Sequence, residues 1–99
     1  MITSDEYSEW VERKIITSPE DRLTENTLGL CEEAGEVAGK IKKRIRDQLK
    51  VSPEDILAEL GDVLFYATAI ANYYEFNLTD IIKLNMLKLD GREARGTLK

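Results

Sequence analysis

The segment AELGDVLFYATAIA, residues 58–71, constrains the fold most, because it is an apolar helix that carries two acids. At 100° per residue, an apolar stripe runs along this helix from Ile56 to Tyr74. Only Glu59 and Asp62 form a narrow acidic strip, since other apolar side chains cover much of the remaining circumference: Leu57, Phe65, Tyr66, Ala69 and Tyr73. A helix that is apolar nearly all round is buried in its own domain or against another subunit. The two carboxylates therefore require a partner there.

The remainder of the chain also predicts helices, and no β-type alternation separates them. We expect an all-α fold of four to five helices, a helical bundle completed by oligomerisation, in a single domain spanning residues 1–99. Each predicted helix begins at a polar capping pattern. The four patterns are Ser4-Asp5, Ser18-Pro19-Glu20-Asp21, Ser52-Pro53-Glu54-Asp55 and Asn77-Leu78-Thr79-Asp80.

Length and charge limit the possible partners. A chain of 99 residues buries a thin core, so association into a homodimer or homotetramer is a natural supplement. The net charge of −5 argues against nucleic acid or an anionic membrane as partner. The acidic start MITSDEYSEW does not resemble a signal peptide, and no apolar run is long enough to span a bilayer. A single cysteine, Cys31, fits a reducing compartment, and we expect a cytoplasmic protein.

A second group of acids, Glu32, Glu33 and Glu36, lies on the helix that precedes the apolar one. If two such helices pack antiparallel, their acids meet. The chain contains no histidine, which excludes imidazole bases and histidine-ligated metals. Carboxylates alone are hard ligands that suit Mg²⁺ or Mn²⁺, and Mg²⁺ usually takes its remaining ligands from water and substrate phosphates. The acids therefore predict a metal site.

Other interpretations remain open at this stage. Glu59 and Asp62 can instead pair with nearby cations, and the acids can belong to a non-catalytic interaction module that packs through tyrosines. Trp10 and Cys31 are expected to be core residues rather than ligand contacts. The cations in question are Lys40, Lys43 and Arg44, and the tyrosines are Tyr66, Tyr73 and Tyr74. Asn85, Lys88 and Arg92 share one face of the last helix, which alone is typical of a solvated surface.

Taken together, these motifs resemble the all-α nucleoside triphosphate pyrophosphohydrolases of the MazG-like type. The resemblance covers roughly residues 20 to 96 and is carried by GLCEEAGEVAGKIKK, ELGDVLFYATAIA and NMLKLDGREARG. In the family, a Glu-Glu-x-x-Glu motif is followed by Glu-x-x-Asp, and here 22 residues separate the two motifs. Many relatives carry an Arg-Tyr-Pro-type segment where this chain reads Arg-Glu-Ala-Arg-Gly at residues 92–96.

The resemblance implies an oligomeric enzyme that hydrolyses (d)NTPs to the monophosphate and pyrophosphate with Mg²⁺ or Mn²⁺. By motif position, the metal ligands are Glu33, Glu36, Glu59 and Asp62. Glu32 matches the remaining acid, which ligates a further metal or orients the attacking water, so Glu32 and Glu33 are the expected catalytic residues. The positions expected to contact the substrate phosphates are Lys40, Asn85, Lys88 and Arg92.

Overall fold

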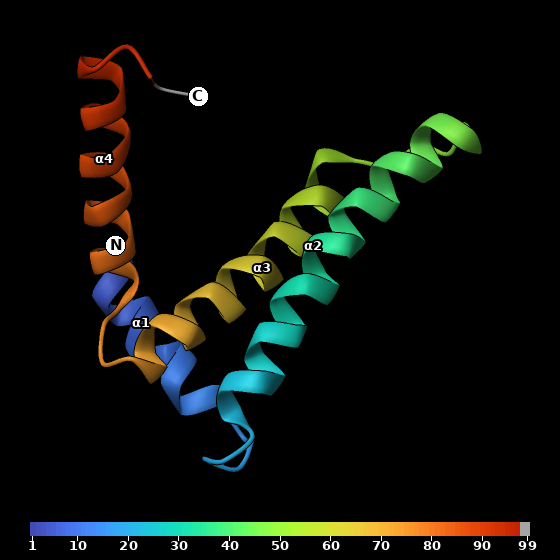
Figure 1. Cartoon of the computed structure of the whole chain (residues 1–99). Helices are drawn as coiled ribbons and strands as arrows, with labels where there is room; N and C mark the ends of the chain where they lie inside the picture. Colours follow the sequence, from blue (N-terminus) through green and yellow to red (C-terminus); the bar gives the residue numbers. More distant parts are fainter. Residues whose placement is uncertain (98–99) are drawn as a thin grey trace.

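The computed structural model describes residues 1–97, which form four α-helices joined by short loops (Figure 1). The helices are α1 (Ser4–Lys14), α2 (Arg22–Arg46), α3 (Pro53–Tyr73) and α4 (Leu78–Ala94). No strand occurs within residues 1–97, so the predicted all-α class is confirmed, with four helices. The predicted domain extends to residue 99, and its last two residues lie outside the described part.

The helices are arranged as a V, in which α2 and α3 form one arm and α4 forms the other (Figure 1). The most extensive helix–helix contact joins α2 and α3, which run antiparallel. Helix α1 lies at the vertex and contacts both α3 and α4. Within residues 1–97, α2 and α4 do not contact one another.

Capping residues explain where α3 and α4 begin. The Ser52 side chain accepts a hydrogen bond from the Asp55 backbone N–H, and Asn77 accepts one from Asp80. In both helices the carboxylate of this aspartate accepts a hydrogen bond from the backbone N–H of the capping residue, which completes a capping box. The two predicted starts are therefore confirmed.

The other two predicted starts are wrong. Helix α1 is capped by Thr3, whose side chain accepts from the Glu6 backbone N–H at 3.1 Å, and not by Ser4 or Asp5. Ser18 does not begin α2. It closes a turn with Asp21 instead, and the helix starts at Arg22. The physical reason is that the chain first makes this turn, which the Asp21 N–H closes by donating to the Ser18 carbonyl. The first helical residue is then Arg22, which pairs with Glu12 of α1 at 2.6 Å.

Hydrogen bonds that Ser8 accepts from α3 and α4 hold the helices together at the vertex of the V. The Ser8 hydroxyl accepts from the backbone N–H of Leu78 at 2.9 Å, and the Ser8 carbonyl accepts from the Asn72 amide at 3.0 Å. Thr79 adds a bond to Asp5 at 2.5 Å. Because these bonds tie α1 to the end of α3 and the start of α4, they set the direction in which α4 leaves the vertex.

A tyrosine lying on a glycine brings α2 and α3 close together. A Cβ atom built on Gly29 would lie 2.5 Å from two ring atoms of Tyr66. No side chain other than hydrogen fits at Gly29 without displacing that ring. Tyr66 is in turn held edge-on to Phe65, with ring centroids 5.3 Å apart. The close approach of the two helices therefore depends on a residue without a side chain.

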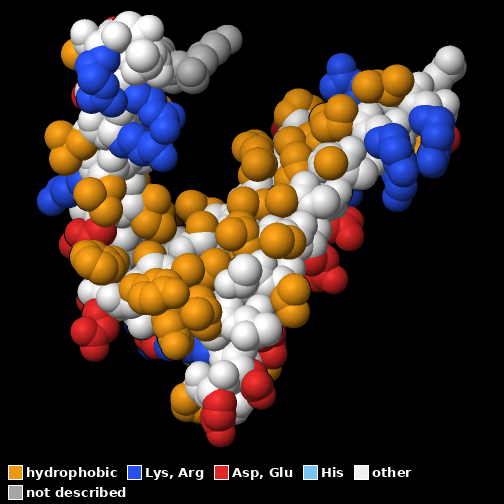
Figure 2. Space-filling view, in the orientation of Figure 1, with side chains coloured by type: hydrophobic (Ala, Val, Ile, Leu, Met, Phe, Trp, Pro, Cys, Tyr) orange, Lys and Arg blue, Asp and Glu red, His pale blue; other side chains and the backbone are white. Residues whose placement is uncertain are grey.

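Much of the apolar surface is uncovered in the single chain (Figure 2). The buried hydrophobic residues among those described are Val11, Ala69 and Leu78. The accessible surface is 7617 Å², whereas a compact monomer of this mass exposes about 5,700 Å². The radius of gyration is 16.0 Å, against about 13 Å for a compact domain of this length. Exposed apolar side chains lie along both arms, among them Leu57, Leu60 and Leu64 on α3 and Leu84, Met86 and Leu87 on α4.

Two residues predicted to be in the core are exposed. Trp10 remains 42% exposed, because its contacts with Phe65 of α3 at 6.1 Å and with Tyr7 at 5.8 Å leave the rest of its side chain uncovered. Cys31 is also exposed, since α2 turns its Gly29 and Glu33 side toward α3 rather than the side that carries Cys31.

None of the helices within residues 1–97 has the length and apolar character needed to cross a membrane.

The Gly29–Tyr66 contact generates a stability prediction. We expect Gly29→Ala to lower the free energy of unfolding by about 1–3 kcal/mol, because the new methyl group overpacks the helix interface. Gly35→Ala is the matched control on the same helix, since no atom lies within 4 Å of the position that its new methyl group would occupy. It should instead stabilise the protein by up to about 1 kcal/mol through helix propensity. Urea unfolding followed by circular dichroism measures both, and equal values for the two variants would contradict the role of the contact.

Candidate functional site

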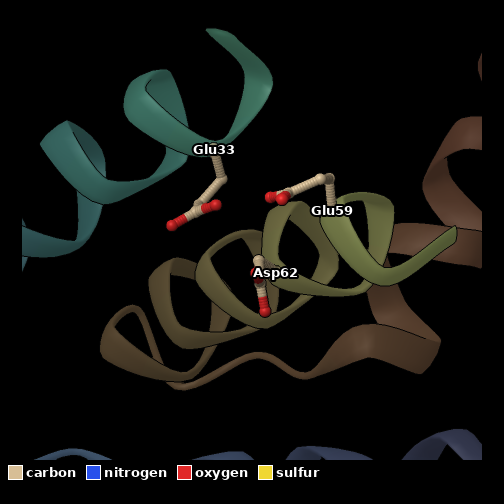
Figure 3. A group of neighbouring side chains, drawn as sticks. All are labelled: Glu33, Glu59 and Asp62. Carbon is tan, nitrogen blue, oxygen red and sulfur yellow. The ribbon is translucent and has the colours of Figure 1, made fainter. Parts of the chain in front are cut away.

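Three carboxylates from two helices converge on one side of the α2–α3 arm (Figure 3). Glu33 comes from α2, and Glu59 and Asp62 come from α3. One oxygen of each lies within 4.8 Å of the others. In Figure 3 the carboxyl groups of Glu33 and Glu59 point toward one another. Antiparallel packing of α2 and α3 thus brings these three residues of the two acidic motifs together.

Helix geometry accounts for this convergence. Glu59 and Asp62 are three residues apart, so they lie on the same face of α3 one turn apart. Glu33 lies one turn after Gly29 on α2. Tyr66 lies one turn after Asp62 on α3. The Gly29–Tyr66 contact therefore sets the register in which Glu33 meets Glu59 and Asp62.

The electrostatics of the cluster favour a bound cation. Partial desolvation, together with the charges of Asp62 and Glu59, raises the pKa of Glu33. Burial, followed by the charges of Glu33 and its neighbours, likewise raises the pKa of Tyr66. Both shifts mean that additional negative charge is unfavourable at this place. A cation between the carboxylates relieves the repulsion.

One of the three acids has an ion-pair partner in the chain. Lys40 Nζ lies 3.7 Å from Glu59 Oε1. This pairing was one of the alternatives that the sequence left open. The contact is long and its two side chains are 33% and 20% exposed, so it contributes little stability. Glu33 and Asp62 have no ion-pair partner within residues 1–97.

The other predicted site residues lie outside this group of three. Glu32 and Glu36 are on α2 beside Glu33, and both are exposed. The three α4 residues lie on the opposite arm of the V, which makes no contact with α2, and Asn85 and Lys88 are exposed while Arg92 is half-buried. A single chain therefore gathers the predicted metal ligands of α3 with Glu33, and it leaves the predicted phosphate contacts of α4 apart from them.

Two tyrosines near the cluster were not predicted as site residues. Burial and the charge of Asp62 raise the pKa of Tyr7, which places this α1 residue in the field of the cluster. From the sequence, Tyr66 was interpreted as part of the apolar cover of α3 or as a packing residue of an interaction module. The signal that identifies Tyr66 is its i, i+4 spacing from Asp62, whereas nothing in the local sequence of α1 brings Tyr7 toward α3.

The donor set fits a hard divalent cation. Three carboxylates that repel one another, with no histidine in the chain and the cysteine Cys31 outside the group, match the ligand preference of Mg²⁺ or Mn²⁺. Fold and site together define an all-α protein with a cluster of carboxylates between two antiparallel helices.

The comparisons with known proteins agree with this class. Residues 21–96 match the family model described as MazG nucleotide pyrophosphohydrolase domain. The chain is also similar to the Gene 37 protein of Mycobacterium phage L5, at 40% identity over 77 residues that cover 74% of this chain and 68% of the phage protein. The chain belongs to the MazG nucleotide pyrophosphohydrolase family. No solved structure matches it significantly.

The site generates a prediction that does not depend on activity. We expect Mg²⁺ or Mn²⁺, at ~100 times its Kd, to raise the melting temperature by on the order of 10 °C. Asp62→Asn should remove most of this increase because a ligand is lost. In EDTA the same variant should melt at or above the parent temperature, because repulsion within the cluster is relieved.

Glu54→Gln is the control for this measurement. Glu54 is an exposed acid in the first turn of α3 and lies outside the cluster, so the variant should keep the full response to the cation. Differential scanning fluorimetry of the three proteins with EDTA, Mg²⁺ and Ca²⁺ provides the comparison. An Asp62→Asn protein that responds to Mg²⁺ as the parent does would show that the cluster is not the cation site.

Proposed function

We propose that this protein hydrolyses nucleoside triphosphates between the α and β phosphorus atoms and releases a (d)NMP and pyrophosphate. The observation that carries the proposal is the convergence of Glu33, Glu59 and Asp62 within a region that matches the nucleotide pyrophosphohydrolase family. Phosphoanhydride hydrolysis requires charge neutralisation and a positioned water more than a covalent nucleophile. A cation held by the carboxylate cluster would neutralise charge on the phosphates, and a nearby free carboxylate would position the water.

We assign Mg²⁺ or Mn²⁺ as the cofactor, held by Glu33, Glu59 and Asp62. Glu36 lies one turn beyond Glu33 on α2, and we assign it as the fourth ligand from its place in the motif. When bound, the cation supplies Lewis acidity and neutralises charge on the phosphate oxygens. The carboxylates orient and hold this charge on two rigid helices rather than on loops.

A glutamate of the chain accepts the proton that the attacking water loses. Glu32 precedes the ligand Glu33 and is exposed, so its carboxylate stays free to accept a proton from the attacking water. The water oxygen forms a bond to one of the two phosphorus atoms, α or β. The bond from the same phosphorus atom to the oxygen that bridges α and β breaks as this bond forms. The bridging oxygen leaves with its electron pair. The proton taken by Glu32 then passes to solvent, which returns the residue to its starting state.

Cations from the chain complement the triphosphate. Lys40 is placed beside the cluster by its contact with Glu59, and it is free to exchange that weak partner for a phosphate oxygen. Asn85, Lys88 and Arg92 lie on the other arm. We propose that they reach the phosphates in the assembled protein, where α4 of one copy approaches the α2–α3 arm of another.

The exposed apolar surface supports assembly into a homodimer or homotetramer. The accessible surface exceeds that expected for a compact monomer by about 1,900 Å². A stable protein–protein interface buries about 800 Å² on each partner. Leucines on the outer side of α3 and along α4 form the surface that a second copy would cover. Oligomerisation would complete the core that one chain leaves thin.

The function is tested directly by its products. A panel of NTPs and dNTPs incubated with Mg²⁺ or Mn²⁺ should release pyrophosphate and monophosphate, and not orthophosphate and diphosphate. EDTA should abolish the reaction. Asp62→Asn should lower kcat/KM by at least about a hundredfold, the scale of one lost charge-stabilising group.

Glu54→Gln serves again as the matched acid outside the cluster and should retain parental activity. The competing class, an acidic interaction module without activity, predicts no pyrophosphate under any of these conditions. Hydrolysis that survives EDTA, or an Asp62→Asn variant as active as the parent, would refute the proposed mechanism.

Assembly is tested by mass. Static light scattering at micromolar concentration should give a molar mass of two or four chains, because the uncovered leucines associate. Leu64→Glu, on the exposed side of α3, should shift the mass toward one chain. Lys42→Glu on α2 is the control, since it also introduces a carboxylate at an exposed position but does not replace an apolar side chain. A parent that remains a monomer would contradict the proposal.

Mixing two inactive variants tests the proposed role of α4 in the same assembly. An Asp62→Asn chain and an Arg92→Ala chain each lack one part of the site. If Arg92 serves the cluster of another copy, hybrids contain one intact site and recover activity above that of either variant alone. If Arg92 serves its own chain, mixing restores nothing.

A further inference from the structure

A second polar feature lies beside the acidic cluster, in a pocket of about 260 Å³ bounded by the end of α1, the α1–α2 loop, the start of α2 and the interior of α3. Its lining includes Asn26, Phe65 and Tyr66. At the mouth, the Thr17 hydroxyl donates to the Glu25 carboxylate at 2.6 Å and ties the α1–α2 loop to α2. We name it the Asn26 pocket after the residue that distinguishes it.

Asn26 is buried without a partner for its amide nitrogen. The residue is 3% exposed, and its Nδ2 atom has no hydrogen-bond partner within residues 1–97. An unpaired buried donor costs free energy, since it has lost water and gained nothing in return. Asn72 provides a contrast, because its amide donates to the Ser8 carbonyl at 3.0 Å. Asn26 lines the pocket, so a ligand that reaches this nitrogen would supply the missing hydrogen bond.

The pocket walls suit a flat aromatic ligand. Phe65 and Tyr66 both line it, and the two rings are held edge to face with centroids 5.3 Å apart. Phe65 also meets Trp10 edge-on at 6.1 Å, so its orientation is fixed from the side of α1. Aromatic walls bind planar heterocycles by stacking and edge contacts, and a buried amide fixes their orientation.

The distance between the pocket and the acidic cluster suits the length of a nucleotide. Asn26 lies seven residues before Glu33 on α2, so the two share a helix face about 10 Å apart. Tyr66 lines the pocket and also lies one turn from Asp62, so one side chain borders both features. This separation matches the span of a nucleotide whose α-phosphate lies at the cluster and whose base points along α2 toward α1.

We propose that the Asn26 pocket binds the base of the nucleotide substrate and that the Asn26 amide donates to a carbonyl oxygen of that base. The proposal rests on the proposed function and specifies its substrate class. Uracil, thymine and guanine carry a carbonyl oxygen at the position where adenine carries an amino group, which is itself a hydrogen-bond donor. A pocket that holds this position of the base against the Asn26 amide favours the carbonyl-bearing bases over adenine, whose amino group would face the buried donor.

The test compares dTTP and dGTP with dATP as substrates. The parent should have a lower kcat/KM for dATP than for at least one carbonyl-bearing nucleotide. Asn26→Leu should reduce that ratio by about tenfold or more, because the donor that distinguishes the bases is gone. It should also melt no lower than the parent, since an unpaired buried polar group is replaced by an apolar group of similar size.

Asn72→Leu is the matched control. It removes an asparagine whose bond holds α3 to α1, so it should lower the melting temperature and leave the ratio between bases unchanged. If Asn26→Leu does not fold, Asn26→Asp keeps the shape of the side chain and replaces the donor by an acceptor. This variant should shift preference toward bases with an amino group. A parent that hydrolyses dATP as well as the others, or a ratio within about twofold of the parental one in Asn26→Leu, overturns the proposal.

Binding separates this inference from the hydrolytic function. Calorimetric titration with dTMP and dAMP in the presence of Mg²⁺ measures base selection without turnover. If no triphosphate is hydrolysed but dTMP binds more tightly than dAMP and Asn26→Leu removes the difference, the pocket assignment stands and the proposed reaction fails. If triphosphates are hydrolysed and dTMP and dAMP bind alike, the reaction stands and the pocket assignment fails.

Discussion

The close contact between Gly29 and the ring of Tyr66 is the interaction on which the site depends. It sets both the distance and the register between α2 and α3. Glu33 lies one turn beyond Gly29, and Asp62 one turn before Tyr66, so the antiparallel pair brings these carboxylates together. Tyr66 and Asn26 meet in the pocket on the other side of the same contact. A shift by one residue would move the acids to different faces and separate them.

The repulsion among the three carboxylates and the uncovered apolar surface have a common consequence. Each is a cost that the single chain does not offset by itself. Desolvation and the charges of Asp62 and Glu59 together raise the pKa of Glu33, and the repulsion among the three acids is part of that shift. The exposed leucines on α3 and α4 show the uncovered apolar surface. In the proposal made above, a cation would relieve the repulsion and a second copy would cover the leucines. Both features of the single chain would then be explained by an assembly that includes its ligand.

Particular residues show how far the sequence analysis reached. The caps of α3 and α4 were predicted correctly because each capping box is complete within four residues. The same four residue types at positions 18–21 form a turn that precedes α2, and Arg22, the first residue of that helix, pairs with Glu12 of a different helix. Trp10 and Cys31 were expected in the core and are exposed, since periodicity identifies an apolar face without showing which neighbour covers it.

By itself, the sequence predicted the all-α class, four to five helices and two acidic motifs on neighbouring helices, because helix periodicity and i, i+3 spacing are local properties of the chain. Family membership was accessible for the same reason, as the motifs are contiguous. Only the tertiary structure decided that Glu33 meets Glu59 and Asp62 within 4.8 Å while the cationic face of α4 lies on another arm. It alone identified Asn26 as a buried donor without a partner. These features depend on the angle at which helices leave the vertex and on what surrounds each side chain, and neither quantity is encoded in the spacing of residues along one helix.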